Sequence, residues 1–79
     1  MDRLFLDANV LFSAAYRPSA GLLQLWKLRN VILCSSRYAL EEARINLTED
    51  AQRRRLTRLA RRTTPVRTEF ARTAFIEFA

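Results

Sequence analysis

The sequence contains no histidine and only one cysteine, Cys34. Because histidine is absent, neither a Ser-His-Asp triad nor the usual zinc sites can be assembled, and a single cysteine cannot form a disulfide within the chain. The N-terminus passes from Leu4-Phe5-Leu6 directly to Asp7, so it lacks the long apolar segment of a signal peptide, and no other apolar run reaches the length of a membrane span. These absences predict a cytoplasmic protein without a membrane partner.

The basic residues are concentrated in the last third of the chain. Residues 1–50 hold six Lys/Arg and six Asp/Glu, whereas residues 51–79 hold eight and two, so this last third carries the net charge of +6. Thirteen of the 14 basic residues are arginine, whose planar guanidinium suits paired hydrogen bonds to phosphate. The pattern predicts a polyanionic partner, nucleic acid first and an acidic protein second. The alternative is a solvated basic helix without a partner.

Short apolar runs that alternate with helical patterns predict one small α/β domain spanning residues 1–79. A hydrophobic content of 49% favours a folded core. Strands are expected at Leu4–Leu6, Val31–Cys34 and, more weakly, Pro65–Arg67. Helices are expected at Val10–Ala15 with Asn9 as cap, from Ser19 to Leu28 with Ser19 as cap, from Ser35 or Ser36 to about Leu47, and at about 48–63 with Thr48 as cap. Strands joined by helices imply parallel pairing, so we expect a partial three-layer parallel sheet flanked by helices.

Asp7 follows the first predicted strand, at the edge of a parallel sheet where ligands gather. A carboxylate in this position can hold a hard divalent cation through oxygen if other oxygen ligands converge on it. The alternative is that Asp7 only caps the next helix or forms a turn, and Asn9 is by the same logic more often a cap than a ligand.

Glu41 and Glu42 are adjacent in the third predicted helix and therefore point about 100° apart. Glu41 has Arg37 and Arg44 at helical spacing and can form an ordinary surface ion pair. Glu42 has mostly apolar neighbours and no basic one at those spacings, which is costly for a carboxylate unless a metal compensates it. Glu42 is therefore the better functional candidate, although simple solvent exposure would also explain it.

Two segments resemble blocks of the PIN domain family. Residues 4–11 (LFLDANVL) are similar to its opening signature, and residues 33–42 (LCSSRYALEE) are similar to its second block, a strand followed by a serine and a helical acid. The resemblance is convincing over residues 3–47 and weaker to about Val66. It implies a magnesium- or manganese-dependent endoribonuclease acting on single-stranded RNA, with Asp7 and Glu42 as metal-binding catalytic acids and with Asn9 and Ser36 as supporting motif residues.

The third and fourth acids of the PIN family have no recognisable counterpart in this sequence, and nothing around Glu69 or Glu77 resembles their motifs. The chain therefore resembles the N-terminal portion of a PIN domain: a fragment, a truncated gene product or a degenerate member. Members that are toxins of toxin-antitoxin pairs bind an antitoxin protein and form homodimers, which makes both expected partners here, although a member need not be a toxin.

Two further hypotheses remain beside the ribonuclease. In the first, the chain is a non-catalytic module that binds nucleic acid or protein through its basic helix, and the acids are structural. In the second, it is a non-functional remnant. Both for the ribonuclease and for the non-catalytic module, RNA contacts are expected from the arginines of the basic helix, namely Arg53, Arg54, Arg58, Arg61 and Arg62.

Overall fold

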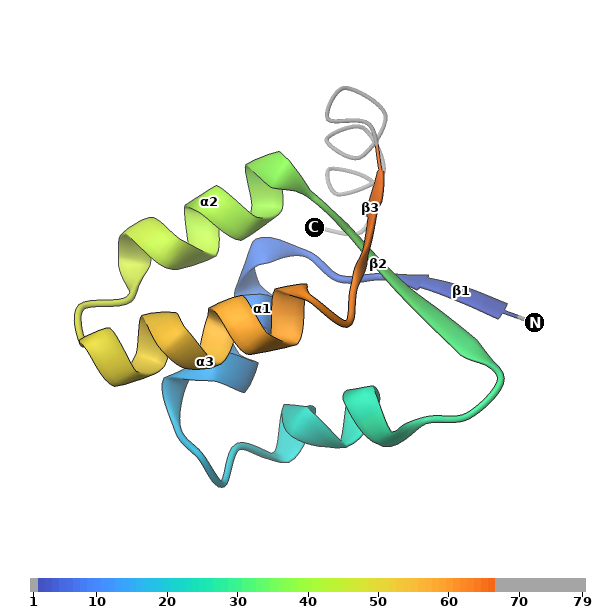
Figure 1. Cartoon of the computed structure of the whole chain (residues 1–79), viewed down its shortest axis with the longest axis horizontal. Coiled ribbons are helices and arrows are strands. Elements are labelled where there is room, and N and C mark those ends of the chain that lie inside the picture. Colours follow the sequence, from blue (N-terminus) through green and yellow to red (C-terminus); the bar gives the residue numbers. More distant parts are fainter. Residues whose placement is uncertain (1, 67–79) are drawn as a thin grey trace.

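The computed structural model describes residues 2–66, and within them it forms a small α/β fold (Figure 1). A parallel sheet has the order β1-β2-β3, with strands at Asp2–Phe5, Val31–Ser36 and Thr64–Val66. The predicted parallel sheet is thereby confirmed. The continuation of the third strand to Arg67, the apolar residues from Phe70 to Phe78, and both Glu69 and Glu77 lie outside the described residues.

Two helical segments separate each strand from the next. Between β1 and β2 lie the α-helix α1 and the 3-10 helix η1, and between β2 and β3 lie the α-helices α2 and α3; their bounds are Ala8–Tyr16 for α1, Gly21–Lys27 for η1, Arg37–Asn46 for α2 and Asp50–Ala60 for α3. The basic helix is therefore shorter than the predicted 48–63. No helix among the described residues is long and apolar enough to cross a membrane.

Three of the predicted helix caps are wrong. Asp7, not Asn9, caps α1, and the helix accordingly begins two residues before the expected start at Val10. Ser19 lies within a turn closed by the Ala20 N–H and the Arg17 carbonyl (3.2 Å), so it does not cap η1.

The third wrong cap is Thr48, because α3 begins one residue later than a Thr48 cap requires. Its N-cap is Glu49, whose N–H donates to the side-chain oxygen of Gln52 (3.1 Å). This pairing resembles half of a capping box and satisfies one backbone donor that the helix start would otherwise leave free.

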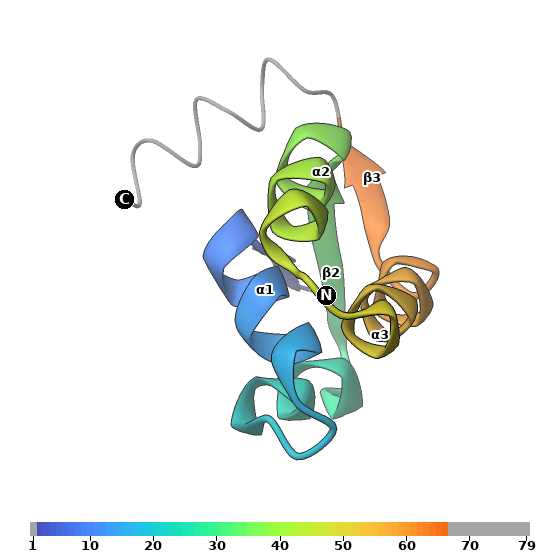
Figure 2. The same ribbon diagram turned by 90° about the vertical axis from the view of Figure 1, so that its left-hand side faces the viewer.

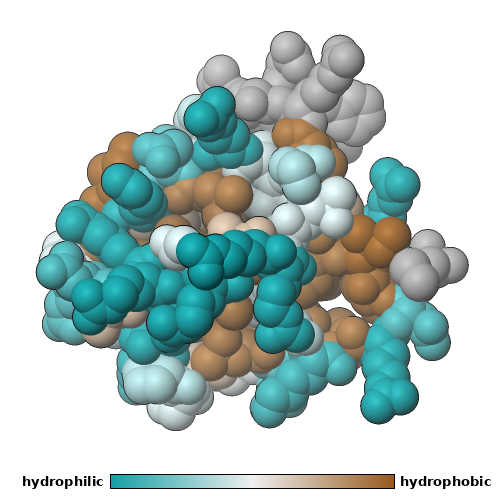
Figure 3. All heavy atoms as spheres, in the orientation of Figure 1, coloured by the Kyte–Doolittle hydropathy of each residue, from teal (hydrophilic) through white to brown (hydrophobic). Residues whose placement is uncertain are grey.

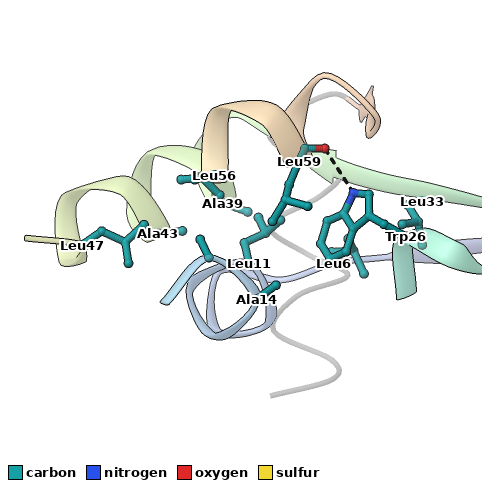
Figure 4. Packing of buried hydrophobic residues seen from close by; sticks show 11 residues of the cluster. Leu6, Leu11, Ala14, Trp26, Leu33, Ala39, Ala43, Leu47, Leu56 and Leu59 are labelled. Atoms are coloured by element: carbon teal, nitrogen blue, oxygen red, sulfur yellow. Dashed lines mark hydrogen bonds between the residues drawn. The ribbon is translucent and has the colours of Figure 1, made fainter. Parts of the chain in front are cut away.

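All the helices contribute to one hydrophobic cluster on a single face of the sheet (Figure 4). On the sheet side the cluster contains Leu33 of β2, with Val31 packed against it. Its buried members are Leu6, Leu11, Ala14, Ala15, Trp26, Leu33, Ala39, Ala43, Leu47, Leu56 and Leu59. The strands follow one another across the sheet in chain order. When every crossover between parallel strands has the same handedness, this order places all the connecting helices on the same face.

The opposite face of the sheet carries Phe5, Ile32, Cys34 and Val66, because residues that pair across parallel strands point to the same side and side chains alternate along a strand. Cys34 is buried and the other three are half-buried. Figure 3 shows hydrophobic atoms toward the right of the molecule, where Figure 1 has the strands. The second helix layer of the expected three-layer fold is therefore not found among residues 2–66.

Side chains of α3 join it to segments far away in sequence. The Arg55 guanidinium donates to the carbonyls of Ala15 (2.9 Å) and Tyr16 (3.4 Å), and the Gln52 amide also donates to Tyr16 (3.3 Å). At the other end of α3, the Trp26 indole N–H donates to the Leu59 carbonyl (3.1 Å), as Figure 4 shows. These bonds fix α1 and η1 against α3.

Replacing Arg55 with Gln is expected to lower the free energy of unfolding by about 1–2 kcal/mol, because hydrogen bonds from a charged donor to the carbonyls at the end of α1 are lost. The matched control is Arg54→Gln, since Arg54 is the exposed neighbour and should change stability by less than about 0.5 kcal/mol. Urea denaturation followed by Trp26 fluorescence measures both. Equal effects of the two substitutions would contradict this role of Arg55.

Candidate active site

The ends of β1 and β2 are tied together at one edge of the sheet. The Leu6 N–H donates to the Cys34 carbonyl (2.8 Å), and the buried Ser35 hydroxyl donates to the Leu6 carbonyl (2.9 Å). The next residues are Asp7, which follows β1, and Ser36, which ends β2, so the chain leaves the two strands at the same level. The sequence alone placed Asp7 at this edge, and the structure agrees.

Asp7 and Ser36 each cap the helix that follows. The Val10 N–H donates to Asp7 Oδ1 (2.9 Å), and the Ala39 N–H donates to Ser36 Oγ (3.0 Å). The predicted capping role of Ser36 is confirmed. The N-termini of α1 and α2 therefore lie beside each other. The positive ends of the two helix dipoles favour an anion at this edge of the sheet.

Glu42 lies six residues beyond Ser36, about 9 Å along the axis of α2. Its side chain is half-buried, whereas that of Glu41 is exposed. Neither acid forms an ion pair within the described residues, so the surface pair expected for Glu41 is not formed there. Because α2 packs against α1, Glu42 lies on the element next to the helix that Asp7 begins.

A hollow lies between the start of α1 and the end of α2. It is lined by Ala8, Asn9, Phe12 and Asn46. Asn9 is exposed and makes no cap, so its carboxamide is available to a ligand in this hollow. The Asn46 amide donates to the Glu42 carbonyl (2.8 Å) one turn earlier in α2. Sequence reasoning missed Asn46, and its position four residues after Glu42 is the signal that could have shown it.

The oxygen-rich side chains near this edge suit magnesium or manganese better than a softer metal. The bond from Val10 uses one acceptor position of Asp7, and a carboxylate has about four. Among residues 2–66, however, no group of three or more acidic, histidine or cysteine side chains could together hold a metal ion. Within the described residues, Asp7 and Glu42 therefore do not by themselves complete a metal site.

The arginines predicted to bind RNA serve two different purposes. All five are exposed, as expected. However, Arg53 donates to the Leu47 carbonyl (3.0 Å) and Arg62 donates to the Trp26 carbonyl (2.9 Å), so these two hold the fold together. The other three lie on the helix surface around a hollow lined by Arg54, Thr57, Arg58 and Arg61.

This arginine surface, made of Arg54, Arg58 and Arg61, points away from the core. Leu56 and Leu59 mark the buried side of α3, and the three arginines lie on the far half of the helix at about 100° per residue. Figure 2 shows the start of α1 on one side of α2 and α3 on the other. The arginine surface and the edge at Asp7 thus lie in different parts of the molecule.

Comparison with known proteins adds no relative. A scan against protein-family models finds no match, and searches of curated proteins and of solved structures find none either.

Substitutions at Asp7 separate its capping role from its charge. Asp7→Asn should leave the thermal midpoint nearly unchanged, because asparagine caps a helix about as well as aspartate. Asp7→Ala should lower stability by about 1 kcal/mol through loss of the bond from Val10. Thermal unfolding followed by circular dichroism gives both values, and a large loss in the asparagine variant would show that the negative charge itself is structural.

Proposed function

We propose that the chain is part of a PIN-like, metal-dependent endoribonuclease that cleaves single-stranded RNA. The observation that supports this most is the sheet edge at which Asp7 and Ser36 follow neighbouring strands and start two adjacent helices. Asp7 and Ser36 belong to the two sequence blocks that resemble the PIN family, and the packing of α1 against α2 adds Glu42 on the adjoining element. Two helix N-termini at the same edge also suit the phosphate of an RNA strand.

In this proposal, Asp7 and Glu42 are the metal-binding acids, and magnesium or manganese when bound would orient a phosphate, offset its developing charge and lower the pKa of a water molecule. Asn9 and Asn46 border the adjoining hollow and can donate hydrogen bonds to a phosphate or sugar oxygen. Ser36 fixes the start of α2 and hence the direction in which Glu42 is presented.

Two acids alone would position a metal poorly. Magnesium requires nearly octahedral geometry, and a displacement of about 1 Å in a reacting group can cost on the order of a hundredfold in rate. We therefore propose that full activity needs further acids from outside residues 2–66, supplied by a continuation of the domain, a second copy or a partner protein. If the protein is a toxin, an antitoxin would bind near this edge.

The expected result for the 79-residue chain in saturating magnesium is little or no cleavage of single-stranded RNA, together with weak metal binding. Calorimetric titration with manganese should show weaker binding for Asp7→Asn and for Glu42→Gln. The matched control is Glu41→Gln, which removes an equal charge from the neighbouring, exposed position and should bind the metal as the unmodified chain does. If Glu41→Gln and Glu42→Gln behaved alike, Glu42 would not be a metal ligand.

The arginine surface of α3 supports a second candidate function, nucleic-acid binding without catalysis. Its three side chains are exposed and surround a hollow, which is suited to phosphate contacts that need no metal. In this alternative the acids at Asp7 and Glu42 have only structural roles.

Arg54, Arg58 and Arg61 are replaced together with Gln. The slope of log affinity for RNA against log salt is expected to become less steep by about two units, because the counterions that three phosphate contacts would release stay bound to the RNA. A second triple variant, with Gln at Arg3, Arg29 and Arg44, makes the same change in net charge at exposed positions elsewhere. Fluorescence anisotropy at several salt concentrations compares the two. An unchanged slope for the first variant would exclude this surface.

A further inference from the structure

The outward side of α1 carries two aromatic rings, and a cation follows them. Phe12 and Tyr16 follow Asn9 at spacings that place them on one side of the helix, and Arg17 comes next as its extended C-cap residue. The rings of Phe12 and Tyr16 contact each other, with centroids 5.4 Å apart and planes inclined by 35°. Tyr16 is 48% exposed, whereas Phe12 is half-buried against the core. The pair therefore presents a supported aromatic surface to solvent.

Phe12 joins two hollows along this helix. It lines the hollow beside Asn9 and Asn46, next to the edge at Asp7. It also lines a second hollow that surrounds the end of α1 and the turn after it, together with Ser13, Tyr16, Arg17, Ser19, Ala20, Gly21 and Leu22. The two hollows thus lie on either side of one shared lining residue, Phe12.

The lining of the second hollow fits a nucleotide. It combines two aromatic rings, two serine hydroxyl groups and one arginine, and none of its lining residues is acidic. Aromatic side chains bind unpaired bases by stacking, and arginine binds the backbone phosphate. The arginine surface of α3 differs, because the residues around its hollow include no aromatic side chain and can recognise only charge.

The end of α1 is held rigidly enough to present these groups. Arg55 and Gln52 donate to the carbonyl of Tyr16, and the Ala20 N–H donates to the carbonyl of Arg17 (3.2 Å). Both residues are therefore fixed through their backbone while their side chains remain exposed. A ligand that binds a surface already in place loses less conformational entropy.

We propose that the outward side of α1 binds single-stranded nucleic acid, with one base stacked on Tyr16 beside Phe12 and a phosphate held by Arg17. This inference rests on the proposed ribonuclease function, for which it supplies the path of the substrate. The bound nucleic acid then continues past Asn9 to the sheet edge at Asp7. Arg17 and Tyr16 determine binding, whereas Asp7 and Glu42 determine metal-dependent chemistry.

The test measures binding of a fluorescently labelled, single-stranded RNA by anisotropy in the presence of a metal chelator. Tyr16→Leu should weaken binding by at least about fivefold, the smaller end of the range for loss of one stacked base. Tyr16→Phe keeps the ring and should bind within about twofold of the unmodified chain. Leu28→Ala, at another half-exposed apolar position outside the two hollows, is the control and should have no effect.

Two further measurements make the result decisive. Binding of a base-free polyphosphate should be weakened by Arg17→Gln but not by Tyr16→Leu, because stacking requires a base. Circular dichroism checks that each variant is folded. Unchanged RNA binding by folded Tyr16→Leu, or equal losses for RNA and polyphosphate in this variant, would overturn the proposal. Because no metal is present, failure of the metal site leaves these outcomes unchanged, and the two proposals are tested separately.

Discussion

The hydrogen bonds that α3 and the turn after it donate to carbonyl groups at the ends of earlier segments hold the structure together. Arg55 bonds to the last carbonyls of α1, Arg53 to the carbonyl of Leu47 after α2, and Arg62 to the carbonyl of Trp26 in η1. Helices end with unsatisfied carbonyls, and a glycine in the left-handed conformation commonly helps to satisfy them. This chain has a single glycine, Gly21, at the start of η1 rather than at a helix end. Guanidinium groups of α3 and of Arg62, just after it, perform that task instead.

The same hydrogen bonds change how the arginines of the basic helix are interpreted. Counting arginines predicts a polyanionic partner for the whole helix, because a count does not distinguish a side chain bonded to its own chain from one in solvent. The structure divides them: Arg53, Arg55 and Arg62 satisfy carbonyl groups within the fold, and Arg54, Arg58 and Arg61 form the arginine surface. Only the second group can contact a partner without weakening the packing of α1, α2 and η1.

The fold class and the strands could be predicted from the sequence, because apolar runs followed by polar residues are a local signal. The same local signal narrowed the cap of α2 to Ser35 or Ser36, since the switch from strand to helix occurs within two residues, and the structure has Ser36 as the cap. The caps at Asn9, Ser19 and Thr48 were predicted wrongly because neighbouring residues compete for the same backbone donors and only the backbone angles decide among them. Arg55 was missed because its role depends on the packing of helices, whereas Asn46 was missed although its spacing from Glu42 can be read in the sequence.

If the proposed ribonuclease function holds, the location of the acids on α1 and α2 favours a substrate path along α1 rather than along α3. Asp7 and Tyr16 belong to the two ends of the same helix, about 13 Å apart along its axis. A short single strand can span that length while it touches both, and the bonds from Asp7 at one end and from α3 at the other keep the helix in place. The arginine surface faces away from the core. A nucleic acid bound only there would have to pass around α2 to reach Asp7. The arginine surface therefore suits a second, sequence-independent contact with a longer nucleic acid, which raises its local concentration without positioning it for chemistry.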